Sequence, residues 1–234
     1  MTFYYIIFIV FVVLYVGYYQ FYLKRKNARQ AEEVSKADFK AEFANASLYR
    51  QNLLATDLSF LKKAMGEETI DAFNYANAET SVASALKEGV KDRLKGMATL
   101  GTVRFTTVNT PKYLVLSGDN LHLLDTDTDG EIDRHLIFNR SRLENSRLAE
   151  IPLEGQSKAQ AMARGENVRV YKLSLQTDGK PVELILYSCL IFTEIPEIPT
   201  DPAETVQAIV IANDFLKQLG DKYPNLKVTL PIFG

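Results

Sequence analysis

The N-terminal part of the chain contains its longest apolar run. Residues 3–23 read FYYIIFIVFVVLYVGYYQFYL and include no charged side chain. About 20 such residues in a helix span the hydrocarbon layer of a bilayer. Tyrosines lie near both ends of the run, as is typical of residues at the two membrane interfaces. The pattern predicts a transmembrane anchor over residues 1–23, with the lipid bilayer as the partner of residues 3–23.

A cleaved signal peptide is the alternative interpretation of this run. Such a peptide has basic residues before a shorter apolar core and small residues at its cleavage site. Here only Met1 and Thr2 precede the run, and the basic segment KRKNAR follows it. A retained single-pass anchor is therefore favoured, and the positive-inside rule predicts that the C-terminal side lies in the cytoplasm. The basic residues are Lys24, Arg25, Lys26 and Arg29.

Residues 24–97 carry helical patterns. Between residues 30 and 54, apolar positions stand among charges at irregular helical spacing, which predicts a partly buried juxtamembrane helix. Three shorter segments, TDLSFLKKAMG, EETIDAFNYAN and TSVASALKEGVKDRLKG, also read as helices, with cap signals such as threonine or glycine at their ends. We therefore expect a helical spacer after the anchor.

The pattern changes near Gly101 to short β-branched and aromatic runs. GTVRFTTV, KYLVLS, NLHLL, DRHLIF, VRVYKLSLQ and VELILYSCLIF are separated by turn signals, a spacing typical of an antiparallel meander. A helix is expected from Asp201, where DPAE combines an N-cap, a first-turn proline and a capping-box acid, to Gly220. The tail LKVTLPIFG could add a short edge strand. The expected buried face of the helix comprises Val206, Ile209, Val210, Phe215, Leu216 and Leu219.

The stretch LLDTDTDGEIDRHLIF, residues 123–138, has the alternating acids of a calcium loop. An EF-hand loop requires a glutamate at its twelfth position, where this chain has Leu136, and flanking helices, where strand-like runs stand. Calcium binding on this turn is therefore an alternative and not the main interpretation. The candidate ligands are Asp125, Asp127, Asp129 and Asp133.

A β-hairpin explains the same stretch better. Asp129-Gly130 suits a two-residue type I′ turn, whose central residues take positive φ angles. In that register apolar residues face apolar residues and opposite charges face each other, which favours the hairpin. The expected pairs are Leu123 with Leu136, Leu121 with Phe138, and Asp125 with Arg134.

Other chemistry in the sequence is sparse. A net charge of −2 and a pI of about 5.8 do not indicate a nucleic-acid partner. His122 and His135 would lie diagonally on one face of the hairpin, where half-exposed side chains are expected rather than a metal pair, since no third ligand is apparent. Cys189 lies in an apolar run and is expected to be a buried thiol. Without a nucleophile motif or a phosphate-binding glycine loop, we expect no enzymatic activity and no cofactor.

Three segments of the β-region share features with one known domain family. YLVLSGDNLHLL (residues 113–124) resembles the strand–turn–strand of bacterial pleckstrin-homology-like (PH-like) domains, and IFNRSRLENSRL (residues 137–148) resembles their following strand. The helix from Asp201 is similar to the one that closes the open end of their barrel, whereas Asn120 stands where many relatives carry arginine. This resemblance covers about residues 98–222. It implies a two-sheet barrel that contacts protein or lipid.

The expected protein is therefore of the α+β class in three parts. Residues 1–23 form the transmembrane anchor, residues 24–97 the helical juxtamembrane region, and residues 98–234 an antiparallel PH-like β-barrel or sandwich closed by a C-terminal helix. We expect a membrane-anchored cytoplasmic binding or scaffold protein with a membrane or cytoplasmic protein partner. The alternative is a membrane-anchored calcium-binding protein that uses the acidic turn.

Overall fold

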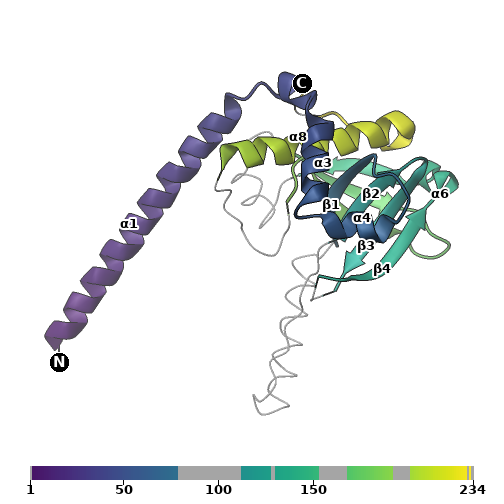
Figure 1. Cartoon of the computed structure of the whole chain (residues 1–234). Helices are drawn as coiled ribbons and strands as arrows, with labels where there is room; N and C mark the ends of the chain where they lie inside the picture. Colours follow the sequence, from purple (N-terminus) through teal and green to yellow (C-terminus); the bar gives the residue numbers. More distant parts are fainter. Residues whose placement is uncertain are drawn as a thin grey trace, which may run out of the picture.

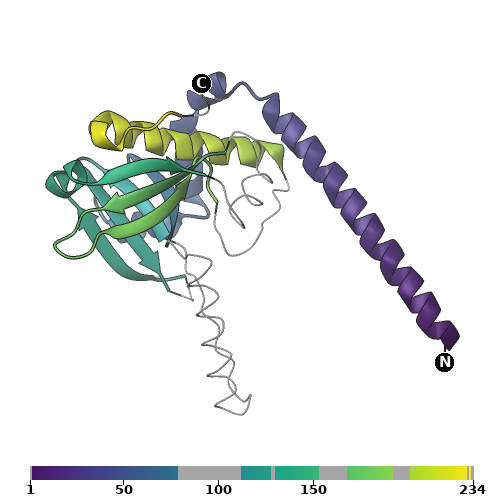
Figure 2. The ribbon, with the colours of Figure 1, turned by 180° about the vertical axis from the view of Figure 1, so that it is seen from behind.

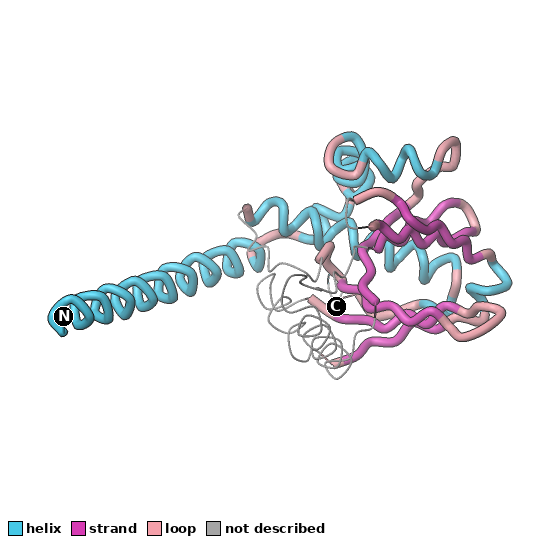
Figure 3. Tube along the Cα trace, turned by 90° about the horizontal axis from the view of Figure 1, so that it is seen from below, coloured by secondary structure: helices cyan, strands magenta, loops and turns pink. Residues whose placement is uncertain are grey.

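The computed structural model describes residues 2–78, 112–127, 130–152, 168–191, 201–230 and 232. The chain begins with a long helix, α1 (Thr2–Ser35), which extends away from the rest of the protein (Figure 1 and Figure 3). Three short helices follow it: α2 (Phe39–Phe43), α3 (Ala46–Ala55) and α4 (Ser59–Met65). Counting only the described residues, no helix is both long and apolar enough to cross a membrane.

Seven strands form one antiparallel sheet, in the order β4-β3-β2-β1-β7-β6-β5. The expected α+β class and antiparallel pairing are confirmed for the described strands, but β4 and β5 stand at opposite ends of the strand order and β1 pairs with β7, so the order is not that of one simple meander. The helix expected over residues 80–96 and the strand expected over residues 101–108 lie outside the described residues. The strands are β1 (Ala72–Ala78), β2 (Lys112–Ser117), β3 (Asn120–Thr126), β4 (Ile132–Phe138), β5 (Arg147–Ile151), β6 (Val170–Leu175) and β7 (Val182–Tyr187).

The helix expected over residues 67–77 is wrong, because residues 72–78 form strand β1. This strand lies at the centre of the sheet and pairs with β2 on one side and β7 on the other. Phe73 and Tyr75 pack on one face of the sheet, and Ala72 and Ala76 pack on the other. Both faces are buried, so the strand shows no apolar–polar alternation that would reveal it. The sheet thus takes its central strand from the region expected to be a helical spacer.

The sheet curves around one core that the C-terminal helix completes. Side chains from all seven strands meet residues of α8 (Pro202–Lys222) in this core, and α8 lies across the sheet (Figure 1 and Figure 2). Asp201 caps the helix, since its Oδ1 accepts the backbone N–H of Ala203 at 2.9 Å. The expected buried face is confirmed: Val206, Ile209, Val210, Phe215, Leu216 and Leu219 are all buried.

A second layer covers the other face of strands β1 to β3. Leu61 and Met65 of α4, together with Leu54 of α3, pack against residues of these strands such as Phe73 and Val115. As a result, β2 and β3 are buried on both faces along most of their length. This layer positions the candidate site described below.

Two expectations about the C-terminal part are wrong. Helix α8 continues to Lys222 and does not end at Gly220. A Cβ on Gly220 would lie 3.0 Å from the Cα of Lys227, so this glycine permits a close approach of the tail. The short edge strand that the tail LKVTLPIFG could add is also not formed in the described residues 227–230. The tail instead begins with a 3₁₀ helix, η1 (Pro224–Leu226), and its Leu230 packs into the core.

The stretch expected to resemble a single strand, residues 137–148, is divided. It holds the end of β4, a short helix α6 (Arg140–Glu144) and the start of β5. The side chain of Asn139 caps α6 by accepting the backbone N–H of Arg142 at 3.2 Å. The polar residues that the sequence shows here therefore form a helical turn between two strands.

The burial of Phe215 yields a first prediction. Its side chain is fully buried between α8 and the sheet, so Phe215→Ala should lower the free energy of unfolding by about 3–5 kcal/mol. Chemical denaturation monitored by circular dichroism would measure this change. Lys217→Ala, on the exposed side of the same helix, is the control and should change stability little. Equal stability of the two variants would contradict the role of α8 in the core.

Candidate functional site

The β3–β4 hairpin has the register expected from the sequence. Leu121 pairs with Phe138, Leu123 with Leu136, and Asp125 with Arg134. Near the turn the register shifts by one residue. Asp127 and Glu131 then close the loop, with the Asp127 N–H donating to the Glu131 carbonyl at 2.8 Å. Gly130 takes a φ of 82°, as expected, but the shift replaces the expected two-residue turn by a longer loop with a bulge at Asp133.

The acids of this turn have structural partners. The Oδ1 of Asp125 accepts from the Nζ of Lys112 at 2.9 Å, and the Oδ1 of Asp127 accepts the backbone N–H of Glu131 at 2.9 Å. Asp133 is exposed at the bulge, and Asp129 lies outside the described residues. Within the described part of the chain, no three His, Cys, Asp or Glu side chains are grouped to hold a metal ion. The described residues therefore offer no observation in favour of the calcium alternative.

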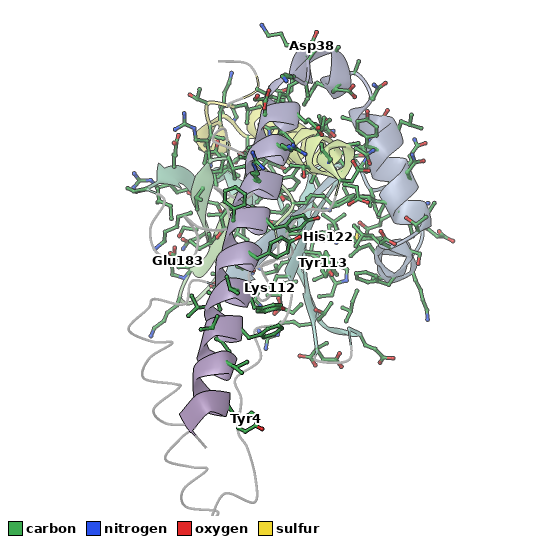
Figure 4. The ribbon with its side chains drawn as sticks, turned by 90° about the vertical axis from the view of Figure 1, so that its left-hand side faces the viewer. Tyr4, Asp38, Lys112, Tyr113, His122 and Glu183 are labelled. Atoms are coloured by element: carbon green, nitrogen blue, oxygen red, sulfur yellow. The ribbon has the colours of Figure 1, made fainter. Side chains whose placement is uncertain are left out.

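The two histidines of the hairpin form a direct contact. They lie on one face of the hairpin, diagonal to each other as expected, and the Nδ1 of His122 is 2.8 Å from the Nε2 of His135. His135 is exposed, but His122 is completely buried, so the expectation of half-exposure is wrong for His122. The layer of α3 and α4 covers this face of the sheet. Figure 4 labels His122 of β3 and Tyr113 of β2, two strands that pair directly.

Glu68 is a third member of this cluster, which sequence reasoning missed. It lies in the segment between α4 and β1, and its Oε2 is 3.0 Å from the Nε2 of His122. The distance is that of an ion pair, yet this nitrogen has no partner in hydrogen-bond geometry, so we treat the contact as electrostatic. The two nitrogens of His122 face two different partners. One metal ion therefore cannot be bound by all three side chains in this arrangement.

Burial and charge act in opposite directions on His122. Burial lowers the pKa of His122 below its ordinary value of 6.5, the carboxylate of Glu68 raises it, and the neighbouring His135 lowers it. The net direction is downward, so His122 is neutral at neutral pH. Glu68 then lies beside a neutral imidazole, and its half-exposed carboxylate keeps an oxygen for other contacts.

A pocket adjoins this cluster. It has a volume of about 310 Å³ and lies between α3, the end of α4 and the segment that leads to β1. Glu68 belongs both to the histidine cluster and to the wall of this pocket. The pocket is lined by Arg50, Gln51, Leu54, Lys62, Gly66, Glu68 and Ile70.

Arg50 is held in place by α8. Its guanidinium donates to the Oδ2 of Asp214 at 2.6 Å, and both side chains are largely buried. The Nε2 of Gln218 donates to the same carboxylate oxygen at 2.9 Å. Burial raises the pKa of Asp214, and the hydrogen bonds from Gln218 and Arg50 oppose this shift. The network orients Arg50 at the base of a pocket that no sequence motif marked.

Comparison with known proteins does not assign the chain to a family. No protein-family model matches the chain, and no curated protein matches it.

The hairpin yields a second prediction. Gly130→Val should destabilise the fold by about 1–3 kcal/mol, because a β-branched residue is strained at a φ of +82°. Asp127→Asn should change stability by less than about 0.5 kcal/mol, since the amide keeps the oxygen that accepts the Glu131 N–H. Thermal melts with and without calcium complete the test, and we expect no shift. A calcium-dependent rise in melting temperature that Asp127→Asn abolishes would contradict this expectation.

The buried histidine yields a third prediction. Because the pKa of His122 is lowered on folding, its contribution to stability is present above about pH 6.5 and is lost as the pH falls through the folded pKa. As the pH falls below about 6.5, the stability of the wild type should therefore drop more steeply than that of His122→Gln. His135→Gln, which removes the exposed partner, should keep most of the slope. Identical slopes for the wild type and His122→Gln would show that His122 does not titrate in this way.

Proposed function

We propose that this chain is a single-pass, membrane-anchored binding or scaffold protein whose PH-like domain contacts protein or lipid. The observation that carries the proposal is the exposure of apolar side chains along α1. Tyr4, Phe11 and Leu14 are 77%, 69% and 65% exposed, which is unfavourable in water and favourable in a bilayer. Residues 3–23 include side chains that the structure does not describe, so the apolar character of the whole run comes from the sequence.

Aromatic side chains at the end of the apolar run support the same proposal. Tyr18 and Tyr22 stack with ring centroids 6.1 Å apart, and the guanidinium of Arg25 lies 5.0 Å from the ring centroid of Phe21. Aromatic rings and a cation side by side suit the boundary between hydrocarbon and headgroups. We therefore propose that the membrane interface lies at these rings, just before the basic segment that follows residue 23.

The end of α1 is attached firmly to the folded domain. Val34 is buried with Val206, Ile209 and Val210 of α8, in a cluster that also includes Phe39 and Phe43. An anchor that inserts in the membrane would thus hold the domain in a defined position close to the bilayer. Because the basic residues Lys24 to Arg29 follow the run, we propose that the domain lies in the cytoplasm.

The PH-like part of the proposal is supported by topology. The order of the seven strands and a C-terminal helix packed on their common core are compatible with a PH-like barrel, although not specific to it. Such a fold can display different binding surfaces. We propose protein or lipid contact as its role and no enzymatic activity.

Membrane fractionation provides the fourth prediction. The full-length chain should sediment with membranes, and a variant without residues 3–23 should be soluble, because it lacks the apolar run. In the full-length chain, a Val12→Arg and Val13→Arg double variant should insert less well, since each arginine at the centre of a span costs about 2.5–3.5 kcal/mol. Leu48→Arg is the matched control: Leu48 is also exposed, but it lies in α3.

Orientation is tested with the same samples. Protease added outside intact cells should leave the domain uncut. Efficient digestion without lysis would reverse the proposed orientation, and membrane association unaffected by loss of residues 3–23 would overturn the anchor.

A further inference from the structure

We infer that the pocket beside Glu68 binds a small ligand, or a headgroup, that carries both an anionic group and a primary ammonium. The pocket brings together side chains from three separate segments: Arg50 of α3, Lys62 of α4 and Glu68 of the segment before β1. Its volume of about 310 Å³ is at the lower end of the range for ligand pockets. A compact polar molecule fits this space.

The charges of the lining select the ligand class. Arg50, Lys62 and Glu68 line the pocket, and the Asp214 carboxylate balances the charge of Arg50. Lys62 and Glu68 remain as one cation and one anion, so a simple anion would be repelled by Glu68 and a simple cation would be repelled by Lys62. A ligand with both charges offers each side of the pocket an opposite charge, so the lining favours a zwitterion.

The side chain of Arg50 is positioned before any ligand arrives. Of the three guanidinium nitrogens of Arg50, only Nη1 has an acceptor in the described part of the chain. This acceptor is the Asp214 carboxylate, at 2.6 Å. The other guanidinium donors remain available for an anionic group. Lys62 is exposed and has no ion-pair partner in the described part of the chain.

Glu68 is also in contact with a histidine of the hairpin. One oxygen lies 3.0 Å from the buried Nε2 of His122, and the carboxylate is half-exposed toward the pocket. An ammonium can donate to the remaining oxygen. Since His122 is itself in contact with His135 at 2.8 Å, the position of Glu68 is coupled to the hairpin and is not that of a free surface side chain.

Calorimetric titration of the full-length chain in an uncharged maltoside detergent tests the inference. The probe is phosphoethanolamine, and its two halves, inorganic phosphate and ethanolamine, are titrated separately. Phosphoethanolamine should bind about tenfold or more tightly than either half, which corresponds to one charge-assisted contact. Phosphate binding as tightly as phosphoethanolamine would overturn the zwitterion assignment, and no heat with any of the three would overturn the site.

Matched variants locate the binding. Lys62→Glu and Glu68→Gln should each weaken binding by about tenfold. Lys63→Glu and Glu67→Gln change neighbouring exposed residues that do not line the pocket, and both should bind as the wild type does. Arg50 is left intact, because its loss would leave Asp214 buried without its cation. Equal weakening by a variant and its control would overturn the assignment to this pocket.

Vesicles separate the two sources of such a ligand. If the natural ligand is a lipid headgroup, the variant without residues 3–23, once its melt matches that of the full-length chain, should bind phosphatidylethanolamine vesicles through Lys62. It should not bind phosphatidylcholine vesicles, whose quaternary ammonium has no N–H for Glu68. Binding to soluble phosphoethanolamine but to neither vesicle would assign the pocket to a free small molecule. The inference does not depend on the anchor, since the soluble probe reports on the pocket alone.

Discussion

The burial of one face of α8 is the constraint on which the rest of the structure depends. Phe215, Leu216 and Leu219 complete a core to which every strand of the sheet contributes. An antiparallel sheet with a bare apolar face is not stable in water. Without this helix the curved sheet would expose that core. The other faces of α8 then serve to attach the rest of the chain.

Two buried polar residues on α8 make these attachments specific. The Nδ2 of Asn213 donates at 2.9 Å to the carbonyl of Ser188, the residue that follows β7. Asp214, the next residue, binds Arg50 of α3. Buried polar groups are costly unless they are paired. These contacts therefore favour one position of α8 relative to the sheet and to α3, and through α3 they set the geometry of the pocket.

The candidate site follows from the second layer. Because α3 and α4 cover strands β1 to β3, a histidine on the outer face of β3 is buried instead of solvated. The same layer brings the segment before β1, and with it Glu68, onto His122. The end of α1 also packs on α8, so α1, the pocket and the sheet are connected through one helix. A ligand at the pocket and a membrane at α1 would therefore act on parts of a single packed unit.

Local sequence patterns correctly predicted the features that depend on residues close together in the chain. The hairpin register from Leu121 to Asp125, the cap at Asp201 and the buried face of α8 were all predicted. Side-chain pairing across a tight turn, capping and helical periodicity each depend on residues close in the chain. The buried Cys189 was predicted from its apolar neighbours in the same way.

Only the tertiary structure determined the features that depend on contacts between residues far apart in the chain. Strand β1 was mistaken for a helix because its residues are compatible with both states, and only pairing with β2 and β7 selects the strand. The burial of His122 and its contact with Glu68 require the α3–α4 layer, which no spacing in the hairpin reveals. The pocket likewise combines Arg50, Lys62 and Glu68 from separate segments, and the partner that orients Arg50 lies on α8. The sequence by itself thus determined the elements that form through neighbouring residues, whereas the site exists only because packing brings residues from separate segments together.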